Sequence, residues 1–396
     1  MEIPMRKSRI LWSQFHNIQY PMGYIPRDNL NFKDNILDWT GDSLHTNFKS
    51  LFEHLIKRGY HVEILTSDLT KFDARLYGTL MLVDTEEEFT EEERVKLHND
   101  VEKGLGVVVL ADWYNTEVMR SVRFFDDNTK THWHPLTGGC NIPALNALLD
   151  SFGVVIGDRI YDGEITATVV GSGDAVNQRE VVRATFGTGA GLFKFPKGAT
   201  IVKFPLRDRT AEFSKQNMNS AQQQVDAPVL GFLQYGLGRL AVFGDSNCVD
   251  DVNSPMMCMW LVDHMLKFTT QGSDPDTVLF AKQEVLTEGF VMSQAKLPER
   301  TPGVVVSSRV PLQELIHARP LYNVSRYIGR SPSSEGWSAA GHQDDMELSV
   351  QGGSAFWKVR LMVPVGLMVV VFAYIVYMMM SRGTVLKMTR DSRMRV

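Results

Sequence analysis

A single run of twenty uncharged, apolar residues near the C-terminus constrains this chain more than any other feature. Residues 361–380 read LMVPVGLMVVVFAYIVYMMM, and a short basic tail, SRGTVLKMTRDSRMRV, follows them. At a rise of about 1.5 Å per residue, a helix of this length spans roughly 30 Å, the thickness of the hydrocarbon core of a bilayer. No polar face interrupts the run, as it would in a surface helix of a soluble domain. We therefore expect a transmembrane helix at residues 358–381 and a membrane-bound chain.

The charges on either side of this run predict its orientation. Lys358 and Arg360 precede it, whereas five cations and one aspartate follow it. Because cytoplasmic flanks carry the excess of lysine and arginine, we expect the tail at 382–396 in the cytoplasm and the rest in the lumen. The first residues, MEIPMRKSRILW, contain neither an apolar core nor a small-residue cleavage site, so they are no secretory signal. We favour a C-terminal piece of a longer precursor over a true start at Met1.

The remainder of the chain is acidic and contains few cysteines. Formal charge is −5 at pH 7, and the tail from Ser381 contributes +4, which leaves −9 for the rest. Nucleic-acid binding needs clustered Lys and Arg, so we expect no nucleic-acid partner. In an oxidising lumen Cys248 and Cys258 can close a small loop and leave Cys140 as a buried thiol, although three reduced core cysteines are an alternative. Asn323 begins a glycosylation acceptor pattern, Asn-Val-Ser.

Residues 9–270 alternate between strand-like and helix-like segments. The strands are expected at 10–12, 61–66, 78–84 and 106–111, and the helices at 47–58 and 91–103. The continuous run GVVVLA at 106–111 is typical of a strand buried on both faces. Strands separated by helices predict right-handed crossovers and a mostly parallel sheet, hence an α/β fold. In the second helix Val95, Leu97 and Val101 are expected to point inward.

The pattern changes at about residue 151 and again after Gly272. Short β-branched stretches with many glycines occupy 164–170, 200–205 and 228–233, and a buried strand at 238–244 and an apolar-faced helix at 257–270 follow. After Gly272 the sequence is polar and contains Pro and Ser, although 278–292 can hold some order. We expect an α/β half at 1–150, a β-rich half at 151–272, a flexible stalk at 273–357, the transmembrane helix and the tail.

A search for catalytic motifs finds none of the common nucleophile arrangements. A subtilisin-type triad needs D-[ST]-G, H-G-T-H and G-T-S-M, and none of these occurs. An amidotransferase-type α/β domain carries a cysteine on the turn after a central strand, but after GVVVLA the chain reads Asp112-Trp113-Tyr114-Asn115. The sequence therefore predicts that the nucleophile position is filled by other residues, and we expect no catalytic residue and no cofactor.

Gly244-Asp245-Ser246, after a predicted strand, suggests an alternative enzyme. It resembles the GDS block of serine esterases, with Ser246 as nucleophile and Asp263 and His264 as partners. That block normally opens its domain, and adjacent residues on one helix point about 100° apart. An independent esterase or amidohydrolase is therefore kept only as the alternative.

Other polar clusters have structural explanations. Asp245, Asp250 and Asp251 are expected to form a turn and cap after the strand, with a cation site as the second hypothesis. His132 and His134 face one way in a strand, but no third ligand lies nearby, which favours solvated loop histidines.

A glycine pair and two runs of glutamate also lie near predicted helix starts. Gly138-Gly139 predicts a tight turn that starts a helix capped by Asn141. The glutamates at 86–88 and 91–93 are expected to form a solvated acidic face that favours the start of the second helix.

Four blocks together resemble one family. They are ILWSQFHNIQYPMGYIPRDNL at 10–30, DWTGDSLHTNF at 38–48, GGCNIPALNALLDSFG at 138–153 and GRLAVFGDSNCVDD at 238–251. They are similar to the region downstream of the catalytic domain in membrane-bound transcription factor site-1 proteases, which are subtilisin-like enzymes of the early secretory pathway. The short tail differs from the longer basic, proline-rich tail of animal members and favours a plant-type member.

The resemblance implies a fold, a location and an activity of the full-length protein. It implies a single-pass type I protein of the Golgi and endoplasmic reticulum membranes, whose lumenal serine protease cleaves membrane-tethered transcription factors. It also implies a glutamine-amidotransferase-like (flavodoxin-like) domain without amidotransferase chemistry, packed against the protease domain of the same precursor. No catalytic residue carries over, because the family's catalytic residues lie upstream. Cys248 and Cys258 match cysteines of the family, which favours their disulfide.

Three functions follow from these observations. The first is an accessory and membrane-anchoring region of a site-1 protease. The second is the independent esterase that uses Ser246. The third, a tail-anchored adaptor in the cytosol, takes the N-terminus as it is written.

Overall fold

The computed structural model describes most of the chain before residue 301. It describes residues 4–17, 30, 42–122, 124–126, 130–133, 137–170, 179–214, 224–252, 257–272 and 278–300. The chain divides into two units, Met1–Pro332 and Ser333–Val396, and every described residue belongs to the first.

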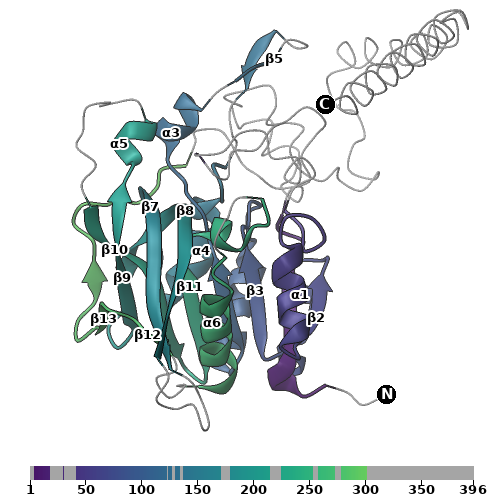
Figure 1. Ribbon diagram of the computed structural model, residues 1–396. Helices are drawn as coiled ribbons and strands as arrows, with labels where there is room; N and C mark the ends of the chain where they lie inside the picture. The colour runs from purple at the N-terminus through teal and green to yellow at the C-terminus, as the bar shows by residue number, and fades with distance from the viewer. Residues whose placement is uncertain are drawn as a thin grey trace, which may run out of the picture. The chain divides into compact units, whose positions relative to one another are not determined.

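Twelve strands form one mixed β-sheet (Figure 1). Along its main path the order is β14-β8-β7-β9-β10-β11-β4-β3-β1-β2, while β12 pairs with β7 and β13 pairs with β9. The strands are β1 (Arg9–Ser13), β2 (His61–Leu65), β3 (Thr79–Val83), β4 (Gly106–Leu110), β7 (Val155–Val170), β8 (Arg179–Phe195), β9 (Thr200–Asp208), β10 (Gln224–Tyr235), β11 (Gly238–Phe243), β12 (Val278–Leu279), β13 (Gln283–Val285) and β14 (Phe290–Val291). A separate hairpin pairs β5 (Phe124–Asp126) with β6 (Thr131–Trp133).

The sheet has a parallel half and an antiparallel half. Strands β2, β1, β3, β4 and β11 run parallel, as the predicted crossovers require. From β11 through β10, β9 and β7 to β8 every pairing is antiparallel. The prediction of a mostly parallel sheet is therefore wrong for the sheet as a whole. The physical reason is that direct hairpin connections can join only antiparallel strands.

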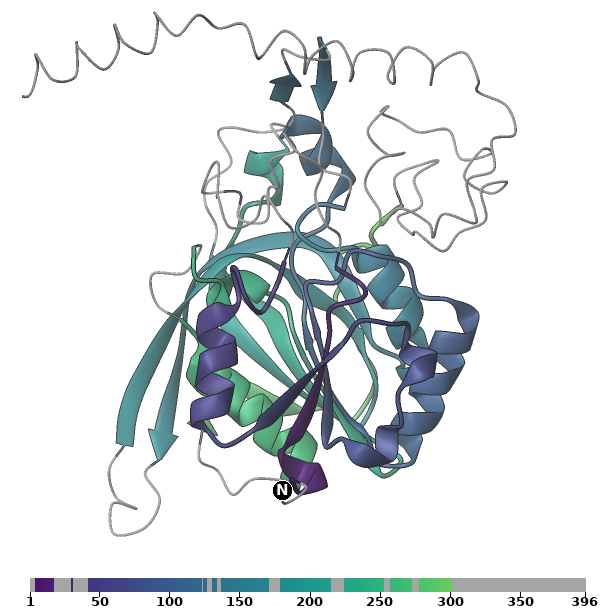
Figure 2. The ribbon, with the colours of Figure 1, turned by 90° about the vertical axis from the view of Figure 1, so that its right-hand side faces the viewer.

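Helices cover both faces of the parallel half (Figure 2). The helices are α1 (Lys49–Lys57), α2 (Glu91–Glu102), α3 (Thr116–Ser121), α4 (Ile142–Leu149), α5 (Thr210–Phe213) and α6 (Met259–Gln271), and the short 3-10 turns are η1 (Arg6–Ser8), η3 (Leu69–Lys71), η4 (Ala74–Leu76), η5 (Asp150–Phe152) and η7 (Ser246–Val249). Residues of α2 and α4 share one apolar core, and residues of α1 and α6 share the other.

The central strands supply both cores. Val107 and Val109 of β4 pack with α2 and α4, whereas Val108 and Leu110 pack with α1 and α6. Because successive side chains of a strand point to opposite faces, a strand between two cores needs apolar residues at every position. The uninterrupted run at 106–111 has this role, as predicted.

Helix α2 begins at a capping box, in which Thr90 and Glu93 exchange side-chain and backbone hydrogen bonds. Leu97 and Val101 are buried, as predicted, but Val95 is 51 % exposed, so the prediction that it points inward is wrong. Glu93 is fully buried, which corrects its expected place on a solvated acidic face. Burial of Glu93 is possible because buried His16 is its hydrogen-bond partner.

The packed structure continues beyond Gly272. The strands β12, β13 and β14 pair with β7, β9 and β8, and the side chains of Leu286 and Ala295 are buried. At residue 300 an arginine makes an ion pair with Glu88. Order in this part of the chain therefore reaches past the boundary that we expected at Gly272.

None of the helices that the structure describes is both long and apolar enough to span a bilayer. The predicted span at 358–381, the tail at 382–396 and the glycosylation pattern at Asn323 all lie outside the described residues.

Candidate functional site

Acidic side chains follow three neighbouring strands of the parallel half. Asp84 comes directly after β3, Asp112 lies two residues after β4, and Asp245 lies two residues after β11. These strands are hydrogen-bonded neighbours, so their carboxyl ends share one edge of the sheet. This carboxyl edge is where α/β proteins bind ligands. It is the candidate site, and all three aspartates in it are buried.

Asp112 lies just after β4, where we expected the nucleophile position of an amidotransferase-type domain. Its Oδ1 accepts a hydrogen bond from the Trp113 backbone N–H at 2.6 Å, and its Oδ2 accepts one from Nδ2 of Asn247 at 2.8 Å. Gly139 packs so closely that a Cβ there would lie 2.5 Å from Oδ2 of Asp112. The carboxylate is fixed by its neighbours, and it is fully shielded from solvent.

Asp84 and Ser246 are buried and hydrogen-bonded to each other. The Ser246 hydroxyl donates a hydrogen bond to Oδ2 of Asp84 at 3.2 Å, and both residues are at most 2 % exposed. Asp84 has a left-handed backbone with φ of 48°, a conformation that aspartate tolerates better than most residues. The hydroxyl that the esterase alternative requires as a nucleophile is therefore closed to a substrate.

The expected partners of Ser246 have other contacts. Asp263 accepts hydrogen bonds from Nε2 of His54 and Nε of Arg58, each at 2.9 Å, and so links α6 to α1. His264 lies against aromatic rings, 5.3 Å from the centre of Phe232 and 5.5 Å from that of Phe280. The prediction of a Ser-His-Asp assembly for the esterase alternative is wrong. Ser246, Asp263 and His264 contact different groups in different parts of the domain.

Asp245 is the acid whose protonation the fold changes most clearly. Its Oδ2 accepts a hydrogen bond from the Gly187 backbone N–H at 2.7 Å, and among the described residues its Oδ1 has no hydrogen-bond donor. Burial raises the pKa of Asp245 from its ordinary 3.8 to about 7, against the opposing effect of the Gly187 hydrogen bond. At neutral pH this side chain is therefore divided between the carboxylic acid and the carboxylate.

A second group of acids adjoins these strand ends. Nδ2 of Asn47 donates to Asp42 and also, at 3.2 Å, to Oδ2 of Asp250. Burial, reinforced by the charge of Glu86, raises the pKa of Asp42 well above its usual value. Burial and the charge of Asp42 do the same to the pKa of Asp84. Buried acids that repel one another favour the protonated form, so this edge is an electrostatically unfavourable place for negative charge.

The glutamates that follow β3 belong to this buried edge. Glu86 is 1 % exposed and Glu87 is fully buried, so the prediction of a solvated acidic face at 86–88 is wrong for both. The carbonyl of Glu86 accepts a hydrogen bond from Nδ2 of Asn141 at 2.8 Å, which draws this segment against the start of α4.

The predicted glycine turn does lead into a capped helix. The side chain of Asn141 accepts a hydrogen bond from the Ala144 backbone N–H at 3.2 Å, at the start of α4. Cys140 beside it is a free, buried thiol whose Sγ lies 3.2 Å from the Thr85 carbonyl. Burial raises the pKa of Cys140 well above its usual value, and a neutral thiol is a poor nucleophile.

A buried hydrogen-bond network around His16 was not predicted from the sequence. Nδ1 of His16 lies 2.9 Å from the Ser13 hydroxyl, and its Nε2 lies 2.9 Å from Oε1 of Glu93. Oε1 also accepts the Leu69 backbone N–H at 2.9 Å. Burial acts to raise the pKa of Glu93, but the hydrogen bond and charge of His16 outweigh it and bring the pKa to about 2. Ser13, His16 and Glu93 are fully buried, so their hydrogen bonds link β1 to α2 and present no nucleophile to solvent.

The described residues do not support a metal site. Among them, no group of three or more His, Cys, Asp or Glu side chains is arranged to hold a metal ion. Oδ1 of Asp250 accepts the Val252 backbone N–H at 2.6 Å, which is the turn that we predicted there, and Asp251 accepts the Ser50 backbone N–H. Both carboxylates thus bind the backbone as a turn and a cap, which was the first of the two interpretations. His132 lies on β6, and residue 134 lies outside the described residues.

A disulfide closes the segment after β11. It joins Cys248 in η7 to Cys258 at the start of α6, with the two Cα atoms 5.5 Å apart. The Cys258 backbone N–H also donates to the Cys248 carbonyl at 3.0 Å. The cross-link holds η7, and with it Ser246 and Asn247, against the carboxyl edge.

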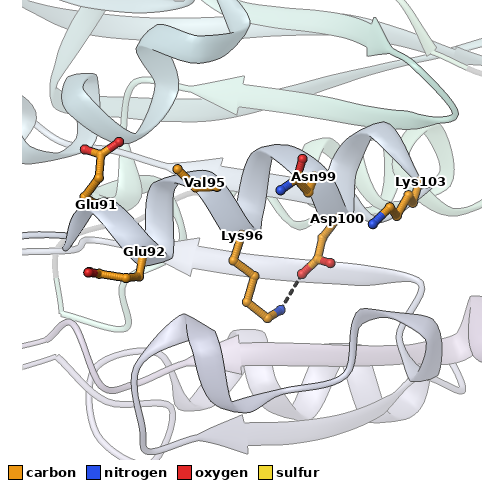
Figure 3. A pocket seen from close by; sticks show the side chains of 7 residues that line it. All are labelled: Glu91, Glu92, Val95, Lys96, Asn99, Asp100 and Lys103. Atoms are coloured by element: carbon orange, nitrogen blue, oxygen red, sulfur yellow. Dashed lines mark hydrogen bonds and ion pairs between the residues drawn. The ribbon is translucent and has the colours of Figure 1, made fainter.

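A shallow hollow of about 490 Å³ lies on the outer face of α2 (Figure 3). Its lining residues are Glu91, Glu92, Val95, Lys96, Asn99, Asp100 and Lys103. Within it Lys96 and Asp100 form an ion pair along the helix. Charges that are paired along one exposed helix make a surface feature, not a catalytic pocket.

The comparisons with known proteins decide the family. Residues 4–284 match the family model described as "MBTPS1, fourth GATase-like domain". The chain belongs to this family. The resemblance that we drew from the four sequence blocks is therefore confirmed, and the GATase-like α/β fold is confirmed with it.

Relatives in plants and animals match this chain at similar levels. Subtilisin-like protease SBT6.1 of Arabidopsis thaliana is 44% identical over 307 residues, which cover 77% of this chain and 28% of that protein. Membrane-bound transcription factor site-1 protease of Homo sapiens is 42% identical over 278 residues, 69% of this chain and 25% of that protein. Among solved structures, the mmIFT52 N-terminal domain aligns with a TM-score of 0.40 and 16% identity, over 68% of this chain and 100% of that one.

This chain therefore spans about a quarter of the length of the curated relatives that it matches. Family membership makes residues 4–284 a GATase-like domain, and the curated relatives that share this region are proteases by name. The whole carboxyl edge, from Asp42 to Asp250, falls within the matched residues.

Proposed function

We propose that this chain is the non-catalytic accessory and membrane-anchoring region of a site-1 protease. Its partner is the protease domain of the same precursor. The full-length protein acts as a serine endopeptidase that cleaves membrane-tethered transcription factors on the lumenal side of the Golgi and endoplasmic reticulum. Family membership and the names of the relatives support this proposal.

One observation carries the non-catalytic role. At the position after β4 where we expected the nucleophile of an amidotransferase-type domain, Asp112 is buried and accepts hydrogen bonds from Trp113 and Asn247. The nearby thiol of Cys140 and hydroxyl of Ser246 are buried as well. A nucleophile needs an accessible atom with a base within hydrogen-bond reach, and neither group meets both conditions. The domain therefore contributes structure, not chemistry, to the protease.

The sequence supports the anchoring role. The apolar run at 361–380 has the length of a bilayer span, and the cations that follow it favour a cytoplasmic tail. The disulfide between Cys248 and Cys258 suits an oxidising lumen. With the body of the chain in the lumen, the acceptor pattern at Asn323 lies in the compartment where glycans are attached.

Deletion in the full-length precursor tests the accessory role. A precursor that lacks residues 4–300 is compared with the intact precursor, using cleavage of a membrane-tethered transcription-factor reporter as the readout. We expect the deletion to lower cleavage at least tenfold while the membrane anchor is kept. Full cleavage by the deleted precursor, at equal protein levels, would overturn the proposal.

Glycan attachment tests the topology. In the full-length precursor, glycosidase treatment should increase the gel mobility of the wild-type chain and leave an Asn323→Gln variant less affected by one glycan. Extraction at alkaline pH should leave both in the membrane. A chain that carries no glycan at Asn323 and is digested by protease added to sealed vesicles would favour the tail-anchored adaptor instead.

A further inference from the structure

Three large apolar side chains lie exposed at the amino edge of the parallel half, opposite the buried acids. Met5 is 79% exposed just before η1, Leu237 is 73% exposed in the turn from β10 to β11, and Leu76 is 45% exposed at the end of η4. We call these residues, together with Arg6 and Lys103, the amino-edge patch. Single exposed apolar residues are common, but a group of them marks an interaction surface.

Contacts through Gly104 join two parts of the patch. The Arg6 guanidinium donates a hydrogen bond to the Gly104 carbonyl at 2.9 Å. A Cβ on Gly104 would lie 3.6 Å from Cβ of Leu237. The segment that carries Met5 and the turn that carries Leu237 therefore meet at the same glycine.

Gly78 brings the third part close. A Cβ on Gly78 would lie 2.9 Å from the Arg6 carbonyl and 3.0 Å from Cα of Lys7. Leu76 is two residues from Gly78, so η4 flanks the segment that carries Met5. The segments that carry the three apolar residues thus meet at one edge of the domain, although they come from three distant parts of the sequence.

The rim of this area is basic. Arg6, Lys7 and Lys103 are exposed around it, and Glu102 is the acidic neighbour on α2. A complementary partner would present apolar side chains with carboxylates around them, because charge complementarity sets the register of an interface.

We propose that the amino-edge patch docks the part of the precursor that precedes this domain. The inference rests on the proposed function. The family is described as the fourth GATase-like domain, and the matched region is about a quarter of the length of the relatives. In the precursor that the proposed function requires, the preceding domain joins the chain on the side of Met5, beside the patch. Tethering gives a high effective concentration, and a small interface between domains is then sufficient.

Charge substitutions in the full-length precursor test the proposal. The test variant combines Met5→Asp with Leu237→Asp, and the matched control is Val181→Asp on β8, where the side chain is also exposed, at 61 %. Chemical cross-linking with mass spectrometry measures contacts of Lys7 and Lys103 with the preceding domains. We expect at least tenfold fewer such cross-links in the test variant and no change in the control.

Each result has a defined meaning. Equal cross-linking in the test variant and the wild type, or no cross-links to Lys7 and Lys103 in either, would overturn the docking proposal. Loss of self-association of the precursor, without loss of contacts between its domains, would assign the patch to a second copy and would also overturn it. If these results come together with a defect on deletion of residues 4–300, the proposed function stands and only the docking surface is wrong. Full activity of the deleted precursor would remove both.

Discussion

Asp245→Asn tests whether the buried carboxyl edge makes this domain less stable at higher pH. Asn has nearly the shape of Asp, and its Oδ1 can still accept the Gly187 backbone N–H, which lies 2.7 Å from the carboxylate. The variant removes one ionisable group and keeps the packing. Any change in the pH dependence of the free energy of unfolding therefore reports the ionisation of this side chain.

The sign and size follow from the shift in pKa. The pKa of Asp245 rises from 3.8 in the unfolded chain to about 7 in the folded domain, because burial disfavours the carboxylate. A raised pKa gives a contribution that is fully present below pH 3.8 and is lost as pH rises through 7. The whole loss corresponds to about 4 kcal/mol, and about 3 kcal/mol of it falls between about pH 5 and pH 8.

Urea unfolding of residues 4–300, followed by circular dichroism at several pH values, measures the effect. We expect the advantage of Asp245→Asn over the wild type to grow by about 3 kcal/mol between about pH 5 and pH 8. The control is Asp226→Asn, whose exposed carboxylate pairs with Lys282 at the surface; its curve should run parallel to that of the wild type. Parallel curves for Asp245→Asn as well would refute the argument from burial.

Three further variants test other parts of the structure, each by urea unfolding. Cys248→Ala opens a loop with a sequence separation of 10 and should cost about 3 kcal/mol under oxidising conditions and nothing relative to the wild type in reductant. Gly139→Ala places a Cβ 2.5 Å from Oδ2 of Asp112, and the overpacking should cost roughly 1–3 kcal/mol; an unchanged midpoint would contradict that contact. His16→Ala leaves Glu93 buried without its histidine partner and should cost roughly 3–5 kcal/mol, recovered in part by Glu93→Gln in the same chain.

The parallel half of the fold was predictable because its signals are local. A run such as GVVVLA at 106–111 is apolar at every position because its two faces belong to two cores. The helix that begins at Glu91 carries its cap beside it, in Thr90. Such features depend only on residues a few positions away, so the sequence alone is sufficient to predict them.

The antiparallel half was harder to predict because pairing is not local. Residues 151–272 gave the correct β-rich character, but the order β11-β10-β9-β7-β8 follows from contacts between distant segments. The short strands at 278–291 show the same difficulty. Each has only two or three residues, and each is ordered by the long strand that it joins.

The candidate site was predictable only in outline. The identity of Asp112, just after β4, was predictable because it is visible in the sequence. The burial of Glu86 and the pairing of His16 with Glu93 were not, because they depend on groups up to 77 residues apart. A glutamate in a charged run normally favours solvent, and only the folded chain shows that these glutamates lie inside.

The two edges of the parallel half differ in character: one buries acidic side chains and the other exposes apolar ones. Together they argue for a structural domain. The carboxyl edge buries Asp42, Asp84 and Asp245, whose raised pKa values mean that ionisation opposes folding. An enzyme can use such strained ionisation at an open site, but here the groups have no access to a substrate. These three groups therefore contribute a stability that increases as pH falls, whereas the paired Glu93 contributes in the opposite sense. The amino-edge patch lies at the opposite edge, and there we place contact with the part of the precursor that precedes this domain.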